Sequence, residues 1–134
     1  MAAYAGSSLS VQWIHSGGTV TLEGDFRQFS ITPSVDLYDQ TAGSDAYKTR
    51  IVGVKDSQAS FSAVMQSGGT ALTNALASGT DGTLIAGPEG TASGKQKITL
   101  PAIAMGVKYT IPYNNVVEMT CDWQGNGTRQ DGVY

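Results

Sequence analysis

Apolar and polar residues alternate with a period of two through most of the chain between Leu9 and Trp123. The clearest run places Val117, Met119, Cys121 and Trp123 on one face and Glu118, Thr120, Asp122 and Gln124 on the other. Successive side chains of a β-strand point to opposite faces, so this alternation is typical of strands that are buried on one side. The pattern therefore predicts a mainly β protein, built as an antiparallel β-sandwich or partial barrel.

Strands are expected wherever this alternation holds and turn residues bound it. The expected strand regions are residues 9–13, 19–32, 47–54, 57–66, 83–86, 95–105, 107–111 and 116–124. Lys55 and Asp56 are expected to form a tight turn that joins 47–54 and 57–66 into a hairpin, and Gly24 is expected to mark a β-bulge.

One short helix is expected to flank the sheet, over about residues 69–78. Its apolar residues fall at helical spacing, Thr70 can cap its start and Gly79 can end it. A helix of two to three turns is unstable alone, so it is expected to cover one end or edge of the sheet.

A long acidic loop is expected over about residues 33–46. It contains Pro33, Gly43 and three aspartates, which argue against a regular element, together with exposed-looking apolar residues that a pure linker would lack. Loops of this length are usually functional or disordered. The whole chain is expected to form a single domain over residues 1–134, with a flexible N-terminal arm (1–8) and a polar C-terminal tail (125–134).

Charged residues make up only 14% of the chain, against about 25% in an average soluble domain. A surface so poor in charge is either weakly solvated or covered by neighbouring subunits, and charge depletion is the compositional mark of interface cores. The net charge is −3, and the 8 basic residues form no dense run. Tight binding of nucleic acid by a monomer is therefore not expected.

No catalytic constellation is visible, so the chain is not expected to be an enzyme. His15 and Cys121 are a conceivable base and nucleophile, but Cys121 lies on an apolar strand face and is expected to be a buried core residue, as are Trp13 and Trp123. The loop aspartates lack the spacing of a calcium loop, and the glycine-rich residues 87–94 lack the phosphate-loop motif. No metal and no cofactor is expected.

The N-terminus has no signal-peptide pattern, and no apolar run is long enough to span a membrane. We therefore expect the protein to fold in a cytoplasm, without membrane insertion.

Several segments in a fixed order resemble the major tail tube proteins of long-tailed bacteriophages, which belong to the tail-tube and Hcp-like superfamily. They are AGSDAY (42–47), SFSAVM (60–65), GTALTNAL (69–76), GTLIAGPEGTA (82–92), PAI (101–103) and PYNNVVEM (112–119). The order of strand, acidic loop, two strands, short helix and further strands covers about four-fifths of the chain.

The resemblance implies a subunit that assembles with copies of itself into hexameric rings, each subunit giving strands to a continuous inner barrel. The rings stack into a hollow tube in the virion tail, assembled in the host bacterial cytoplasm, through which double-stranded DNA passes without specific binding. Its other partners would be a tape measure protein, a tail terminator and a baseplate or tip. The alternative is another virion component, either a head decoration protein or a tail-completion protein.

Three groups of residues are predicted to act in such an assembly. The inter-ring or inter-subunit contact is predicted at Val35, Asp36, Leu37, Tyr38, Asp39, Asp45 and Tyr47. The lumen is predicted to be lined by Gln28, Ser30, Glu118, Thr120 and Asp122, with the outside of the tube as the alternative position for that face. Terminal contacts that become ordered only through neighbouring subunits are predicted at Tyr4, Arg129 and Tyr134.

Overall fold

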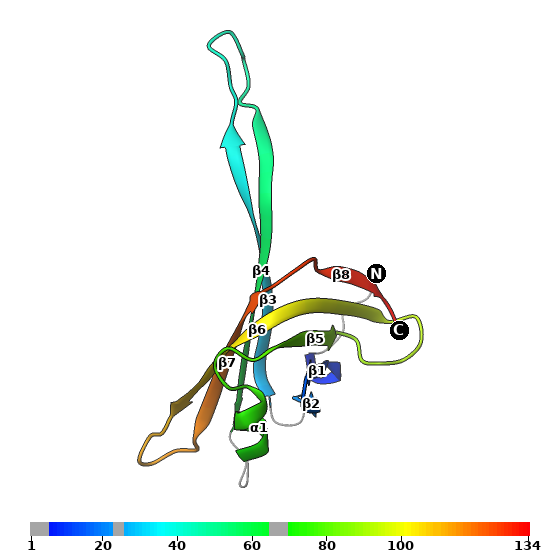
Figure 1. Ribbon diagram of the computed structural model, residues 1–134, viewed down its shortest axis with the longest axis vertical. Coiled ribbons are helices and arrows are strands. Elements are labelled where there is room, and N and C mark those ends of the chain that lie inside the picture. The colour runs from blue at the N-terminus through cyan, green and yellow to red at the C-terminus, as the bar shows by residue number, and fades with distance from the viewer. Residues whose placement is uncertain (1–5, 23–25, 65–69) are drawn as a thin grey trace.

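A computed structural model describes residues 6–22, 26–64 and 70–134, and it shows a mainly β protein with one short α-helix. The elements are a 3-10 turn (Gly6–Ser8), β1 (Ser10–His15), β2 (Gly18–Thr21), β3 (Phe26–Asp39), β4 (Arg50–Val64), α1 (Thr70–Ala75), β5 (Asp81–Gly87), β6 (Gln96–Thr110), β7 (Glu118–Gly125) and β8 (Gln130–Val133) (Figure 1). The predicted fold class is confirmed.

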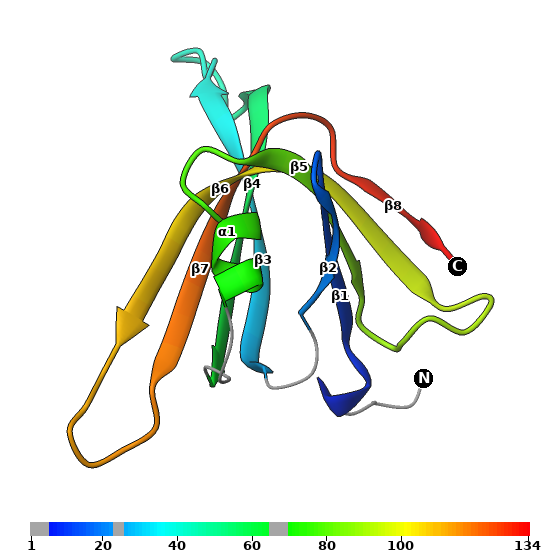
Figure 2. The same cartoon turned by 60° about the horizontal axis from the view of Figure 1, so that its bottom comes forward.

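The strands form one antiparallel 8-stranded sheet in the order β2-β1-β5-β6-β7-β4-β3, and β8 pairs with β6 beside this path. The sheet folds over on itself, so that β1, β2 and β5 face β3, β4 and β7 (Figure 2). The rings of Trp13 on β1 and Trp123 on β7 have centroids 5.9 Å apart, although two strands separate β1 from β7 in the sheet. This contact between the two halves gives the open sheet the character of a sandwich or partial barrel.

The core lies between the two halves and is filled by the inward-pointing residues of the alternating strands. Its largest fully buried side chains are Trp13, Trp123, Phe61, Leu76, Leu84, Leu100, Met119, Val11 and Cys121. The alternation predicted for residues 116–124 is confirmed, because Met119, Cys121 and Trp123 are buried. Burial of such side chains contributes about 1.5–3 kcal/mol each, so this alternation largely dictates which face of each strand points inward.

Helix α1 covers one end of this core and is anchored by a tryptophan. The indole Nε1 of Trp13 donates a hydrogen bond to the Ala75 carbonyl at 2.9 Å, and Leu76 is fully buried. Gly79, with φ of 86°, takes the chain out of the helical region, as predicted, and its N–H donates to Ala104 at 2.8 Å. The helix ends at Ala75, earlier than predicted, and residues 68 and 69 lie outside the described part of the chain.

The two core tryptophans provide a matched test of the helix anchor. Trp123 Nε1 is buried without a hydrogen-bond partner among the described residues, whereas Trp13 Nε1 is bonded to the helix. Trp13→Phe should therefore lower the free energy of unfolding by about 1 kcal/mol more than Trp123→Phe, since only the first leaves a buried carbonyl unsatisfied. Urea unfolding of both variants measures the difference, and equal losses would show that the Trp13 bond contributes nothing.

The predicted hairpin of residues 47–54 and 57–66 is wrong. Residues 50–64 form the single strand β4, which passes through Lys55 and Asp56 and pairs with β3 on one side and β7 on the other. The predicted loop is wrong in its first half, because residues 33–39 continue β3 and only residues 40–49 connect the two strands. Pro33 is tolerated there because β3 is an edge strand.

Two other segments also depart from the sequence-based expectation. Gly106 lies within β6 with φ of 104°, where the pairing with β7 shifts register, so one long bulged strand replaces the two expected strands. The tail of residues 125–134 contains β8, an unexpected strand that pairs with β6 of the same chain. Gly24 and residues 1–5 lie outside the described residues.

Candidate subunit interface

A two-stranded projection is the most prominent feature of the surface. Beyond the pair Pro33 and Ser57, β3 and β4 leave the body together, and we call residues 34–56 the arm (Figure 1). β4 pairs with β7 only from Gln58 to Val64, so no third strand among the described residues pairs with the arm. Every residue from 32 to 52 is exposed. A two-stranded ribbon is at best marginally stable in water, so covering the arm would stabilise it.

Apolar side chains lie on both faces of the arm. The exposed ones are Val35, Leu37, Tyr38, Tyr47, Ile51, Val52 and Val54. Leu37 lies opposite Val52, and the next pair, Tyr38 and Ile51, points to the other face. These four side chains are 51–58% exposed. Monomeric soluble proteins rarely expose large contiguous apolar patches, so an apolar ribbon of this kind marks an interaction surface.

The tip of the arm is held by local hydrogen bonds. Asp39 Oδ1 accepts from the Thr41 N–H and Asp45 Oδ2 accepts from the Ala42 N–H, both at 2.8 Å. Hydrogen bonds from Thr41, first its side chain and then its N–H, lower the pKa of the Asp39 carboxyl below its ordinary value. Both aspartates therefore order the turn. The described residues contain no group of three or more Asp, Glu, His or Cys side chains that could hold a metal ion.

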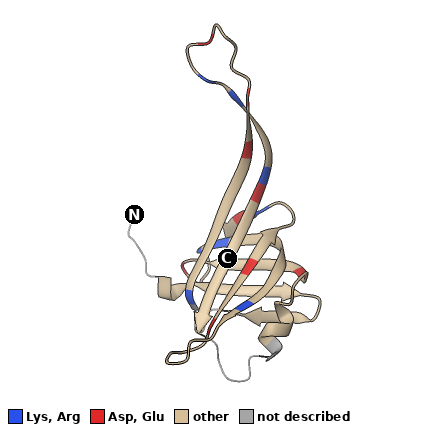
Figure 3. Ribbon diagram, turned by 90° about the vertical axis from the view of Figure 1, so that its left-hand side faces the viewer, with Lys and Arg blue, Asp and Glu red and all other residues tan. Residues whose placement is uncertain are grey.

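The arm is mixed in charge rather than acidic. The returning strand brings Lys48, Arg50 and Lys55 alongside the aspartates, and Arg50 lies opposite Asp39 in register. Figure 3 shows acidic and basic positions interspersed along the ribbon. The predicted acidic loop is thus corrected to an apolar arm with both signs of charge.

The outer faces of β3, β4 and β7 form a second surface, which we call the polar face. Rows of paired residues cross it, namely Gln28, Ser62 and Thr120, then Ser30, Ser60 and Asp122, then Thr32, Gln58 and Gln124. Glu118 lies one row beyond, where its carboxylate pairs with Arg27 at 2.6 Å. The structure thus brings all five predicted lumen residues onto one surface.

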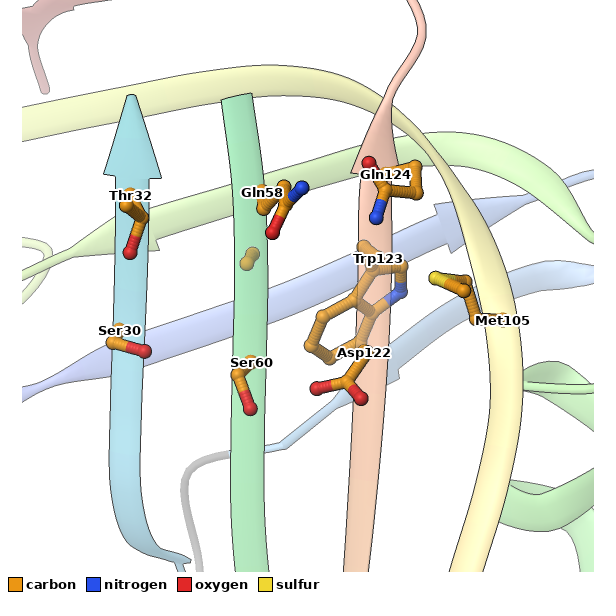
Figure 4. A pocket seen from close by; sticks show the side chains of 9 residues that line it. Ser30, Thr32, Gln58, Ser60, Met105, Asp122, Trp123 and Gln124 are labelled. Atoms are coloured by element: carbon orange, nitrogen blue, oxygen red, sulfur yellow. The ribbon is translucent and has the colours of Figure 1, made fainter. Parts of the chain in front are cut away.

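A shallow pocket of about 270 Å³ lies on the polar face between β3, β4, β7 and β6 (Figure 4). Hydroxyl and amide groups dominate its rim, with Asp122 as the single charged side chain and Met105 on the β6 side. Such a lining offers hydrogen bonds but no acid–base pair.

The two candidate catalytic residues show no sign of activation. Cys121 is fully buried, and burial, with a smaller contribution from the Asp122 carboxylate, raises the pKa of its thiol to about 12. The thiol is therefore protonated at neutral pH and is a poor nucleophile. His15 lies at the end of β1, where its Nδ1 accepts a hydrogen bond from the Gly17 N–H at 3.1 Å.

The predicted terminal contacts have partners within the chain. Arg129 Nε donates to Asp131 Oδ1 at 3.0 Å, and the Tyr134 N–H donates to the Lys95 carbonyl at 2.9 Å. Lys97 Nζ lies 5.4 Å from the Tyr134 ring centroid. Tyr4 lies outside the described residues. Contacts of these residues with neighbouring subunits stay predictions.

One exposed apolar segment, the connection between β6 and β7, was not predicted from the sequence. Ile111, Tyr113 and Val116 are exposed there, beyond the last pair Thr110 and Glu118. A signal was present, since residues 109–117 contain no charged side chain. The turn residues Pro112, Asn114 and Asn115 instead marked the segment as an ordinary hairpin loop.

No protein-family model matches the chain, and no curated protein sequence matches it either. Solved structures do match over nearly its whole length. A chain in the virion of a native gene transfer agent particle superimposes with a TM-score of 0.74 at 12% identity, covering 98% of this chain and 100% of that one. The chain has the tail-tube fold, because it superimposes on the SPP1 tail tube as well.

Two further structures have the same tail-tube fold. A chain in the tail of the empty gene transfer agent particle, determined with C6 symmetry, has a TM-score of 0.73 at 14% identity over 98% of this chain and 100% of that one. The SPP1 tail tube has a TM-score of 0.72 at 9% identity, over 98% of this chain and 80% of that one. The described residues include no helix long and apolar enough to cross a membrane.

Proposed function

We propose that the chain is the structural subunit of a virion tail tube, which assembles with copies of itself into stacked hexameric rings around a channel for double-stranded DNA. The observation that carries this proposal is the arm, which exposes apolar side chains on both faces in a chain with the tail-tube fold. The C6 symmetry of the gene transfer agent tail supports six subunits per ring.

The arm is the main contact between subunits. Within the part of the chain that the structure describes, no third strand pairs with the arm and neither of its faces is covered. A neighbouring subunit would therefore stabilise both its backbone edges and its apolar side chains. An arm that inserts into a different surface of the next copy forms a heterologous contact, and such contacts repeat into rings or open filaments. This arrangement also accounts for the low charge content of the chain.

The polar face lines the channel. β3 is a free edge of the sheet, and joining such edges around a ring extends the sheet into a closed barrel without exposed edges. The polar face is then one wall of that barrel, because its opposite side is filled by the core. Glu118 is paired with Arg27, and the exposed Lys108 of β6 lies opposite Thr120 in register, so the basic groups of this face are few and form no stripe. A wall with so few basic groups, mixed with carboxylates, lets phosphates pass instead of retaining them.

The remaining partners follow from the same role. A tube subunit of the virion tail meets a tape measure protein inside, a tail terminator at one end and a baseplate or tip at the other, and it assembles in the host cytoplasm. It needs no cofactor and carries out no reaction.

Electron microscopy of the purified full chain tests the proposal. Negative-stain images over a range of micromolar concentrations are expected to show rings and hollow tubes. Monomers at every concentration would contradict it, and monomers that bind purified capsids would identify a head decoration or tail-completion protein instead.

A further inference from the structure

The connection between β6 and β7 projects from the end of the molecule opposite the arm. β4 runs from the arm to Val64, which pairs with Glu118 at the start of β7, so residues 111–117 lie beyond the far end of the sheet. Figures 1 and 2 show the arm and this hairpin at opposite ends. At its tip Ile111 is 71% exposed and Tyr113 99% exposed. The molecule thus has an apolar projection at each end.

A hydrogen bond to helix α1 fixes the base of this hairpin. The hydroxyl of Tyr109, just before the tip, lies 2.7 Å from Thr73 Oγ1 on α1. Within the tip, the Val116 N–H donates to Asn115 Oδ1 at 2.8 Å. Presentation of an aromatic ring on a fixed turn lowers the entropy lost when the ring binds a partner.

A groove of about 1080 Å³ lies at the base of the arm, at the end opposite the hairpin. It runs between the first residues of the arm and the connection from β7 to β8. Val35 and Val54, which are 43% and 72% exposed, supply apolar surface, and Arg129 and Asp131 pair with each other along the wall. The groove is also lined by the charged residues Asp36, Lys55 and Asp56. An uncharged apolar occupant would leave the ion pair of Arg129 and Asp131 intact.

We propose that the β6–β7 tip of each subunit, led by Tyr113, seats in the arm-base groove of a subunit in the next ring. The inference rests on the proposed tube. Stacking with one polarity requires that one end of a subunit complement its opposite end, and these two features lie at opposite ends of β7. The tip has no charge over residues 109–117, as expected of an interface centre, and the groove begins where the arm begins, so the two contacts form one continuous surface.

Disulfide cross-linking tests the seating directly. In tubes of a Tyr113→Cys, Val54→Cys variant, oxidation is expected to join successive subunits head to tail, giving a ladder of multimers on a non-reducing gel. A disulfide requires Cα atoms within about 7 Å, so the two positions at opposite ends of one chain cannot react with each other. The matched control is Tyr113→Cys with Thr91→Cys, which places the second thiol at an exposed position off the groove and should give no ladder.

A second variant keeps the inference testable if the double variant does not assemble. Tyr113→Ala is expected to raise the critical concentration for tube formation by at least about tenfold, because an interface aromatic is lost. Tyr113→Phe keeps the aromatic ring and should leave the critical concentration near the wild-type value. Val133→Ala, at an exposed apolar position of β8 outside the groove, should leave it unchanged.

The outcomes separate the two proposals. If the wild-type chain forms tubes, but the two-cysteine variant gives no ladder and Tyr113→Ala does not change the critical concentration, the seating is overturned and the tube proposal stands. A wild-type chain that never forms tubes overturns both.

Discussion

Removal of the arm is expected to leave a folded monomer that no longer assembles at any concentration. Residues 35–55 can be replaced by Asn-Gly, because Ser34 and Asp56 lie opposite each other in register and a two-residue turn of this sequence closes such a pair. No residue of the arm belongs to the core cluster, so the melting temperature of the body should fall by no more than about 4 °C, the shift that a loss of 1 kcal/mol gives in a domain between the small and the medium size class.

Thermal unfolding followed by circular dichroism measures the first half of this prediction, and light scattering with negative-stain microscopy measures the second. Leu37→Thr with Val52→Thr is the graded companion, since it keeps the length and strand propensity of the arm and removes one apolar pair. Its assembly should be weaker than that of the wild type but not lost. Normal tubes from the shortened chain, or a body that fails to fold, would contradict the role given to the arm.

Charge reversal on the polar face is expected to turn a passive channel into one that holds DNA. Glu118→Lys with Asp122→Lys leaves Arg27 without its carboxylate partner and adds two ammonium groups on β7, in the rows on either side of Thr120. Repeated around each ring, these cations neutralise many phosphates at once, so tubes that do not retain short DNA duplexes at low salt should then retain them. The retained DNA should be released as salt rises, with affinity falling by about 10³-fold or more between 50 and 200 mM salt.

Co-sedimentation of a short duplex with assembled tubes measures this retention. Asp81→Lys with Glu89→Lys makes the same change in net charge away from the polar face and is the matched control. If the control retains DNA as strongly as the Glu118 and Asp122 variant, or if neither retains it, the polar face does not line the channel.

The alternation of the strands predicted most of the core because one-sided burial imposes a period of two. Trp13, Phe61, Leu100 and Met119 all stand at positions that the pattern assigned to the interior, and each is fully buried. The same pattern placed the polar partners of these residues on the opposite face, so the rows of the polar face were predictable from sequence even before their register was known.

The arm was not predictable in the same way, because neither of its faces is buried in the monomer. Leu37 and Tyr38 are adjacent apolar residues, as are Ile51 and Val52, so the period of two disappears where the ribbon exposes both faces. A strand of this kind resembles a loop in sequence. β8 was not predicted for a related reason. All of its side chains are exposed, so its sequence shows no alternation, and only its backbone pairs with β6.

A helical reconstruction of the assembled tube by electron cryo-microscopy is the most direct test of the account. The account predicts stacked rings of six subunits, with both faces of the arm buried against neighbouring copies and with Ser30, Thr120 and Asp122 facing the channel. An arm that extends freely into solvent, or a polar face on the outside of the tube, would contradict it.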